Sequence, residues 1–324
     1  MKKTNFTTGS LRKSFAFVLL FLAEFCSGCK LSPSAAVNKF TLSDTKPPVM
    51  LEVYAQSEAS VRLVFDEPVT PVPESFAPFE AAEDGYGIVI ILNESLEAGE
   101  SMKLSGRVED KAGNSVTVSV EVWGYNPHPA GLLINEITTT GTDTSPHRTE
   151  LLAIRSGNTA GTVLYNGIPE DRESFVVLPS IDVSEGDFIV VHWRKTLPKN
   201  TQEHPADNVW NICTGEDIKP SAKNGIQTLA SSPSQGAKVT DCVIYSAQES
   251  ELYEGYGKKA VYERVLKALE NSWWKGEPVI SKNATATRSM SRKLNTGDSD
   301  TASDWYTTET KGSTFGSANT SAPY

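Results

Sequence analysis

The sequence predicts an all-β protein of two antiparallel β-sandwich domains, the second carrying one inserted α-helix. From residue 50 onward, short apolar or alternating segments follow one another, and turn residues such as Gly, Pro, Asn and Asp separate them, a pattern typical of antiparallel sandwiches. Apolar residues at helical spacing occur in the segment 258–271. A chain of 324 residues is too long for one average domain and suits two.

The first 28 residues have the composition of an export signal. Basic residues precede the apolar run Phe15–Ala23, and small residues follow it. This run of nine residues is too short to cross a hydrocarbon core of about 30 Å as a helix. We therefore predict a cleaved signal peptide over residues 1–28 rather than a transmembrane anchor.

The segment Cys26–Cys29 resembles a bacterial lipobox, in which small residues precede a cysteine that is lipidated. The resemblance implies several acyl chains on Cys29, which suffice for stable anchoring. It also implies a lipoprotein of the bacterial cell envelope, either periplasmic or surface-exposed. Two departures are Cys26, where leucine is usual, and Glu24 close to the cleavage site. A simple secretory signal cleaved nearby is the alternative.

The charge of the chain argues against nucleic acid as a partner. The formal net charge is −10, and without residues 1–28 the remaining 26 basic and 39 acidic residues give −13. Non-specific nucleic-acid binding draws its affinity from the neutralisation of phosphates by basic residues. An acidic body also stays off an anionic membrane surface, so we expect acylated Cys29 to make the contact with membrane lipid.

Two cysteines remain after the signal and the anchor, Cys213 and Cys242. A pair of cysteines in an exported chain favours a disulfide. The loop that it closes is worth about 3–4 kcal/mol of stability if the bond acts by restricting the unfolded chain. Two separately buried thiols are the alternative.

Residues 29–46 are predicted to be the lipidated cysteine and a flexible tether, because they are polar, contain a proline and lack periodicity. Residues 47–126 follow as the first sandwich domain. Its expected strands are Met50–Tyr54, Val61–Phe65, Gly87–Leu92, Met102–Val108 and Ser115–Trp123.

Three segments of this first domain, Val61–Val69, Leu96–Leu104 and Val108–Asn114, resemble strands and the D-x-A-G-N turn of bacterial Ig-like modules. The resemblance implies an Ig-like fold and the role of a spacer or an adhesive repeat. We interpret Asp110 and Asn114 as a pair that stabilises the turn. Calcium binding by these two residues is the alternative.

Two prolines in Tyr125–Pro129 mark the domain boundary, and residues 127–324 form the second predicted domain. An ordered series of its fragments resembles lamin-tail domains, which are Ig-like β-sandwiches. The fragments are Leu133–Ile137, Thr149–Ile154, Phe175–Trp193, Val239–Tyr245, Arg288–Arg292, Asp300–Trp305 and Thr314–Asn319. The sequence departs from that family at Phe315, where proline is usual, and at Arg155, where an asparagine is expected.

An insertion at about residues 246–287 interrupts this resemblance. Within it, the segment Lys258–Asn271 predicts a helix whose apolar stripe packs on the sandwich. The stripe consists of Val261, Val265, Leu266 and Leu269. Trp273 and Trp274 follow the helix and are interpreted either as core residues or as exposed anchors for a partner.

Glu136 and Arg292 are predicted to form a structural ion pair. Glu136 lies in the apolar strand Gly131–Ile137, where an ionised carboxylate needs a partner because burying it unpaired is costly. Arg292, on a late strand, can supply a bidentate contact that locks the sandwich. A catalytic glutamate would need a nucleophile or a metal beside it, and the sequence names none.

Asp298, Asp300 and Asp304 are weak candidates for calcium ligands. They lie at alternate positions, but Ala302 and Ser303 stand where a calcium loop needs a ligand and a glycine. We therefore expect no metal and no cofactor, and we interpret the acids as a solvated turn in which Asp304 caps the local backbone. Calcium remains the alternative.

Together these features predict a membrane-anchored envelope lipoprotein that acts as a non-enzymatic binding, adhesion or structural module. Its partner is an unknown protein or carbohydrate. The lamin-tail resemblance likewise implies binding or localisation. The alternative is a metal-dependent lipase or esterase that uses the acids of Asp298–Asp304 with the loop around His204, although the sequence has neither a G-x-S-x-G elbow nor zinc-ligand spacing.

Overall fold

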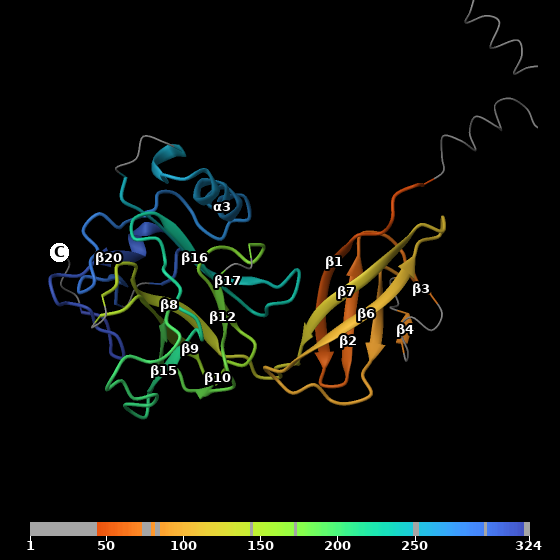
Figure 1. The fold of residues 1–324 in the computed structure, drawn as a ribbon, viewed down its shortest axis with the longest axis horizontal. Coiled ribbons are helices and arrows are strands. Elements are labelled where there is room, and N and C mark those ends of the chain that lie inside the picture. The colour runs from red at the N-terminus through yellow and green to blue at the C-terminus, as the bar shows by residue number, and fades with distance from the viewer. Residues whose placement is uncertain are drawn as a thin grey trace, which may run out of the picture.

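The structure, a computed structural model, describes residues 44–72, 79–81, 85–142, 145–171, 174–248, 253–294 and 297–320. The predicted signal peptide, the lipidation site Cys29 and most of the tether lie outside these residues. Within them the protein is all-β with a single α-helix, which confirms the predicted fold class. Figure 1 shows the two domains side by side. No helix of this part is long and apolar enough to cross a membrane.

The first domain consists of two antiparallel sheets that share one apolar core. The sheets have the strand orders β1-β2-β5-β4 and β3-β6-β7. Their strands are β1 (Met50–Ser57), β2 (Ser60–Phe65), β3 (Thr70–Pro71), β4 (Phe79–Ala81), β5 (Gly87–Ile91), β6 (Ser101–Glu109) and β7 (Ser115–Trp123). Alternation decides which residues are buried: Val61, Leu63 and Phe65 of β2 point inward and meet Val108 and Val122 of the other sheet.

The second domain has a six-stranded sheet, a five-stranded sheet and a small two-stranded one. The six-stranded order is β15 (Val209–Cys213), β14 (Phe188–His192), β9 (Arg148–Arg155), β8 (Gly131–Thr138), β19 (Met290–Arg292) and β20 (Trp305–Thr307). The five-stranded order is β12 (Phe175–Val177), β11 (Val163–Tyr165), β16 (Gly225–Ala230), β17 (Val239–Ser246) and β18 (Val279–Ile280). Strands β10 (Gly157–Asn158) and β13 (Asp182–Val183) form the third.

Two edge strands of the second domain are parallel to their neighbours, which differs from the predicted antiparallel arrangement. β15 pairs with β14 and β18 pairs with β17 in parallel. Parallel neighbours need a crossover rather than a hairpin. Between β17 and β18 the crossover contains the predicted helical insertion, so the helix α3 (Lys259–Glu270) is part of the connection that positions β18.

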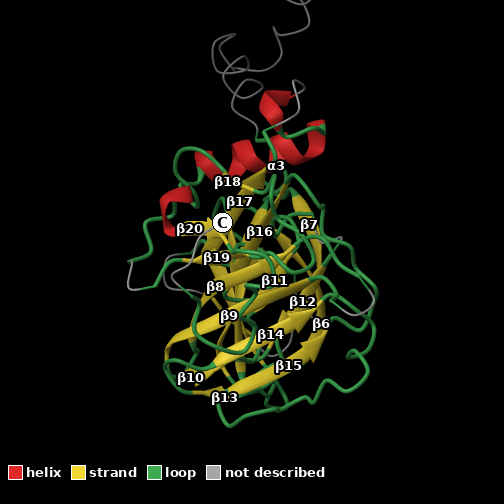
Figure 2. Ribbon diagram, turned by 90° about the vertical axis from the view of Figure 1, so that its left-hand side faces the viewer, coloured by secondary structure: helices red, strands yellow, loops and turns green. Residues whose placement is uncertain are grey.

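Helix α3 lies across one end of the strand layers, as Figure 2 shows. Its buried residues are Val265 and Ala268, whereas Leu266 and Leu269 of the predicted stripe are each 38% exposed. The stripe is therefore rotated from the prediction, because Val261, Val265 and Ala268 recur every three to four residues and share one face. After the helix, Trp274 is fully buried in the core and Trp273 packs at its margin.

Candidate functional site

Arg292 on β19 is buried between carboxylates. Its Nη2 donates to both oxygens of Asp241 at 3.0 Å, and its Nη1 donates to Asp298 Oδ1 at 2.7 Å. Asp304 Oδ2 lies 3.7 Å from the same Nη1, and Nε donates to the carbonyl of Ile134 at 2.9 Å. Burial alone would lower the pKa of Arg292, but the neighbouring carboxylates outweigh burial and raise it. The guanidinium is therefore held charged in the interior.

The predicted ion pair between Glu136 and Arg292 is wrong. Glu136 lies opposite Ser291 in the β8–β19 register, and successive side chains of a strand point to opposite faces. Arg292 therefore faces away from Glu136, toward Asp241 on β17. A β-bulge in β8 between Ile134 and Glu136 produces this arrangement, because it moves Glu136 onto the face opposite to Ile134.

Glu136 instead lies beside a second acid, Glu150. The two are register partners on β8 and β9, and neither is exposed to solvent. The C-terminal segment 313–319 covers them: the Thr314 amide donates to Glu136 Oε1 at 2.9 Å, and the Gly316 amide donates to Glu150. Ser289 Oγ also donates to Glu136. Gly316 has a φ of +84°, so a side chain at this turn would strain the backbone that presents its amide.

The acid pair and Asp241 hold their protons more tightly than exposed acids do. Burial raises the pKa of Glu150 to about 8, against the hydrogen bonds from Gly316 and Asn135, while the charge of Glu136 adds to the rise. Burial likewise raises the pKa of Glu136. For Asp241 burial raises the pKa to about 6, against the opposing charge of Arg292. The folded protein therefore binds protons at these acids more tightly than the unfolded chain does.

The three candidate calcium ligands each have another partner. Asp298 accepts from Arg292, Asp300 pairs with Lys275 Nζ at 3.0 Å, and Asp304 accepts from the Ser299 amide at 2.9 Å and from its hydroxyl at 2.7 Å. They do not form a cluster of metal-ligating groups in the described residues. The predicted cap by Asp304 is confirmed. The turn is not simply solvated, because Asp304 is buried.

A group of three carboxylates with oxygens within 4.8 Å of one another is formed by Asp44, at the end of the tether, and by Glu67 and Asp110 of the first domain. Asp110 Oδ1 accepts hydrogen bonds from the amides of Ala112 and Asn114 at 2.8 Å, and Oδ2 accepts from Asn114 Nδ2 at 2.8 Å. The interpretation of Asp110 and Asn114 as a turn-stabilising pair is therefore confirmed.

The predicted disulfide is absent from the structure, in which Cys213 and Cys242 are both free. The two residues lie on different sheets. Cys242 on β17 is fully buried in the core, while Cys213 ends the edge strand β15 and lines a surface cavity with His204 and Trp210. Burial raises the pKa of both thiols. The alternative of two separately buried thiols holds for Cys242, whereas Cys213 is only partly buried.

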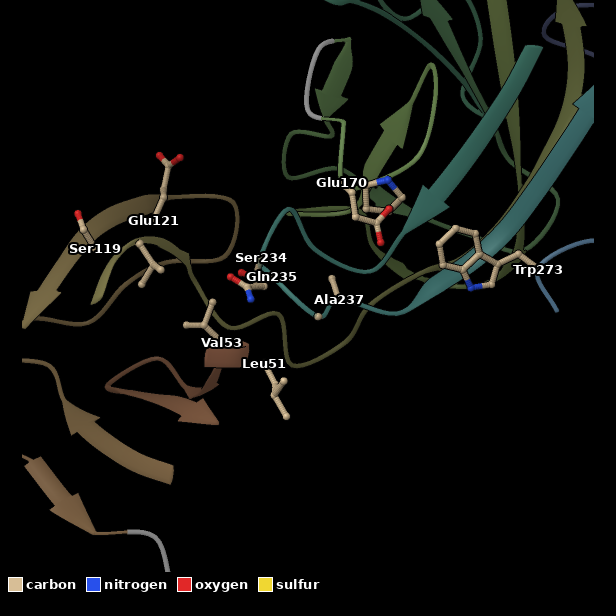
Figure 3. A pocket seen from close by; sticks show the side chains of 12 residues that line it. Leu51, Val53, Ser119, Glu121, Glu170, Ser234, Gln235, Ala237 and Trp273 are labelled. Carbon is tan, nitrogen blue, oxygen red and sulfur yellow. The ribbon is translucent and has the colours of Figure 1, made fainter. Parts of the chain in front are cut away.

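A cavity of about 710 Å³ lies between the two domains (Figure 3). First-domain residues Leu51, Val53, Ser119, Val120 and Glu121 line one wall, and second-domain residues Pro169, Glu170, Ser234, Gln235, Gly236, Ala237 and Trp273 line the other. We call this cavity the interdomain cleft. Its lining combines apolar surface with carboxylates, hydroxyls, an amide and an indole, which suits a ligand site.

Direct hydrogen bonds hold the two walls of the interdomain cleft together. The Val53 amide donates to the carbonyl of Gln235 at 3.1 Å, and Gln235 Nε2 donates to the carbonyl of Met50 at 2.6 Å. At the linker, Asn126 Nδ2 donates to the carbonyl of Asn158 at 2.9 Å. The loop 234–237 approaches β1 so closely that a Cβ on Gly236 would lie 2.8 Å from the side chain of Glu52. The cleft is thus preformed.

Residues 130–307 match the family TP_1001_2nd, described as "protein second domain". The match runs from just before β8 to the end of β20 and covers more than half of the chain. The chain belongs to this family. The matched region contains Arg292 with its partners Asp241, Asp298 and Asp304, which we call the Arg292 cluster. It also contains both acids of the Glu136–Glu150 pair, whereas the first domain and the C-terminal segment 313–319 lie outside it.

An uncharacterized protein of Treponema pallidum (strain Nichols) is 29% identical over 111 residues, which are 34% of this chain and 28% of that protein. The chain thus spans well under half of the length of that relative. No solved structure matches the chain. Neither match is described as a lipoprotein or a lamin-tail domain, so these two resemblances stay predictions.

Asp241 and Glu150 are site residues that the sequence pattern does not identify. Both lay in fragments of the lamin-tail resemblance and in strands expected to be buried, and a buried acid requires a partner. The expected burial of these acids indicates that each needs a partner, but it does not indicate which cation or amide that partner is. Gln235, which joins the domains, stands in a polar loop and carried no sequence signal.

We predict that Arg292→Met lowers the free energy of unfolding by about 3–5 kcal/mol, because it leaves Asp241 buried without its cation. Chemical denaturation measures the change. Arg155→Met, at an exposed position of β9, serves as the matched control and should change stability by less than about 0.5 kcal/mol. Equal effects of the two substitutions would contradict a buried charge pair.

A second prediction concerns the dependence of the melting temperature on pH. The pKa of Glu150 is raised from its ordinary value of 4.5 to about 8, so its proton stabilises the fold below the ordinary value, and this contribution is lost as the pH rises toward 8. The melting temperature should fall between about pH 5 and pH 9. Glu150→Gln should flatten this fall, while the exposed control Glu185→Gln should not. A Glu150→Gln profile parallel to that of the wild type would refute the assignment.

Proposed function

We propose that the chain is an exported lipoprotein, anchored by acylated Cys29 in the membrane of the bacterial cell envelope. Its Ig-like first domain and lamin-tail-like second domain act together as a non-enzymatic binding module. The observation that carries this proposal is the interdomain cleft, because its walls come from both domains and are already joined by the hydrogen bonds of Gln235. A preformed site does not lose binding energy to the ordering of its walls.

Binding is favoured over hydrolysis by the state of the acidic side chains. The hydrolase alternative needs Asp298, Asp300 and Asp304 to hold a metal, yet in the described structure they hydrogen-bond to Arg292, Lys275 and Ser299. The buried Glu136 and Glu150 are in turn covered by the segment 313–319 and do not face the cleft. The cleft is lined by apolar, hydroxyl, amide, carboxylate and indole groups, which suit the binding of a ligand.

The anchor half of the proposal predicts that Cys29→Ser abolishes acylation. Cells that express the full chain are grown with an alkyne-tagged fatty acid, and the label and the membrane fraction are followed. The wild type should carry label and sediment with membranes, and Cys29→Ser should lose the label. Cys26→Ser is the matched control, because the proposed cleavage removes this residue, and it should keep the label. An unlabelled wild type would rule out the anchor.

The binding half predicts a partner at the cleft. A photo-crosslinking amino acid replaces Ala237, which lines the cleft, or Lys111, which is exposed on the D-x-A-G-N turn and serves as the matched control. Irradiation of whole cells should give a discrete envelope adduct from position 237 and none from position 111. The same adducts from both positions, or none from either, would remove the binding proposal.

A further inference from the structure

The two first-domain strands that border the interdomain cleft are both edge strands. β1 ends one sheet and β7 ends the other. The outer edge of β1 is partly occupied, since its Val53 amide and Met50 carbonyl bond to Gln235. β7 is hydrogen-bonded to β6 on one side and to no strand on the other in the described part of the chain, while β1 of the facing sheet lies close to it. An edge of this kind presents backbone donors and acceptors to an incoming chain.

The cleft also has a single sign of charge. Its lining contains the carboxylates of Glu121 and Glu170 and neither a lysine nor an arginine. Glu170 pairs with Lys267 at 2.7 Å, which neutralises part of its charge. Glu121 accepts a hydrogen bond from the neutral hydroxyl of Ser101 at 2.7 Å. Lys103 is its register partner on β6, but the printed hydrogen bond of Glu121 goes to Ser101, so its carboxylate still contributes negative charge to the wall formed by β7. The complementary occupant is therefore cationic.

Trp273 adds a third feature. Figure 3 shows its indole with Glu170 on the second-domain wall, across the cleft from Ser119 and Glu121. An indole face attracts ammonium and guanidinium groups. An extended chain with basic side chains would therefore meet acid and aromatic groups along the length of the cleft, in addition to the backbone of β7.

We propose that the interdomain cleft binds an extended basic peptide segment that adds as a strand to the outer edge of β7. This inference rests on the proposed binding function and names the class of its partner. In strand addition, backbone hydrogen bonds supply affinity and alternate side chains supply specificity. Here alternate basic side chains would face Glu121 and the second-domain wall, and the backbone would pair between Thr117 and Glu121.

A saccharide would make different use of the same cleft. It would stack on Trp273 and hydrogen-bond to Gln235 and the carboxylates without pairing to the backbone of β7. The two occupants are therefore distinguished by the backbone amides of β7 rather than by affinity alone, and the experiment reads those amides.

The experiment uses the full-length protein in detergent and a fluorescent nine-residue peptide of alternating lysine and threonine. Anisotropy should show saturable binding, and amide hydrogen exchange should slow at alternate residues between Thr117 and Glu121. Glu121→Gln should raise Kd about two- to fivefold, as expected for an exposed charge pair. Glu109→Gln, at an exposed acid on the neighbouring strand, is the matched control and should leave Kd unchanged.

Two further peptides separate strand addition from attraction to an acidic protein. A peptide with glutamate in place of lysine should not bind. A lysine–threonine peptide methylated at every backbone nitrogen keeps the charge but lacks every backbone donor, so it should bind at least about tenfold more weakly, since several hydrogen bonds are lost. Equal binding of the N-methylated peptide, unchanged exchange in β7, or equal effects of Glu121→Gln and Glu109→Gln would each overturn the proposal.

Failure of this inference is distinguishable from failure of the proposed function. If the lysine–threonine peptide does not bind while position 237 still gives its adduct in cells, the cleft binds a partner of another class. If position 237 gives no adduct either, the binding function itself is refuted.

Discussion

The second domain depends on one buried cation. Arg292 donates to Asp241 on β17, to Asp298 in the loop after β19 and to the carbonyl of Ile134 on β8. It therefore connects the six-stranded sheet, the five-stranded sheet and the loop between β19 and β20. Buried charges are tolerated only when their hydrogen bonds are complete. The requirement fixes the relative position of three chain segments that are far apart in the sequence.

A second polar cluster lies on the opposite face of the same sheet, where Glu136 and Glu150 meet the C-terminal segment. Three residues of the predicted lamin-tail fragment Thr314–Asn319 hold this part of the structure together. Thr314 and Gly316 supply amides to the acids, and Asn319 Nδ2 donates to the carbonyl of Arg292 at 2.8 Å. Asn319 Oδ1 also accepts from the Thr314 hydroxyl at 3.0 Å, so Asn319 links the segment that covers the acid pair to the backbone of β19. The spacing of this fragment places the Thr314 amide at Glu136 and the Gly316 amide at Glu150.

The sequence pattern predicts the class of each element better than the partners of each side chain. Short alternating segments and one helical segment suffice for an all-β fold with a single helix, because period and turn residues are local properties. The pairing of Glu136 with Arg292 failed for a local reason that the pattern does not contain. Strict alternation would place Glu136 on the face of Ile134, which Arg292 also faces, and the bulge between Ile134 and Glu136 reverses this.

The disulfide failed for a different reason. Two cysteines in an exported chain indicate an oxidising environment in which a disulfide can form. The bond itself also requires the two Cβ atoms to lie close together and to face each other. Cys242 lies within the core and Cys213 at the edge of the other sheet. Strand order decides this, and strand order depends on long-range contacts. Parallel pairing of β15 with β14 is such a contact and has no signal in the local sequence.

In the first domain, the side chains that protect the edge strand β7 also influence which partner it accepts. An unpaired edge strand invites association with any chain, and proteins limit this with charged and polar side chains. Thr117, Ser119 and Glu121, which are the exposed residues of β7, supply such a polar pattern. The same acid that discourages pairing with an apolar strand or with a second acidic copy favours a basic one. The protection of the edge and the selection of a partner therefore follow from one side chain, Glu121.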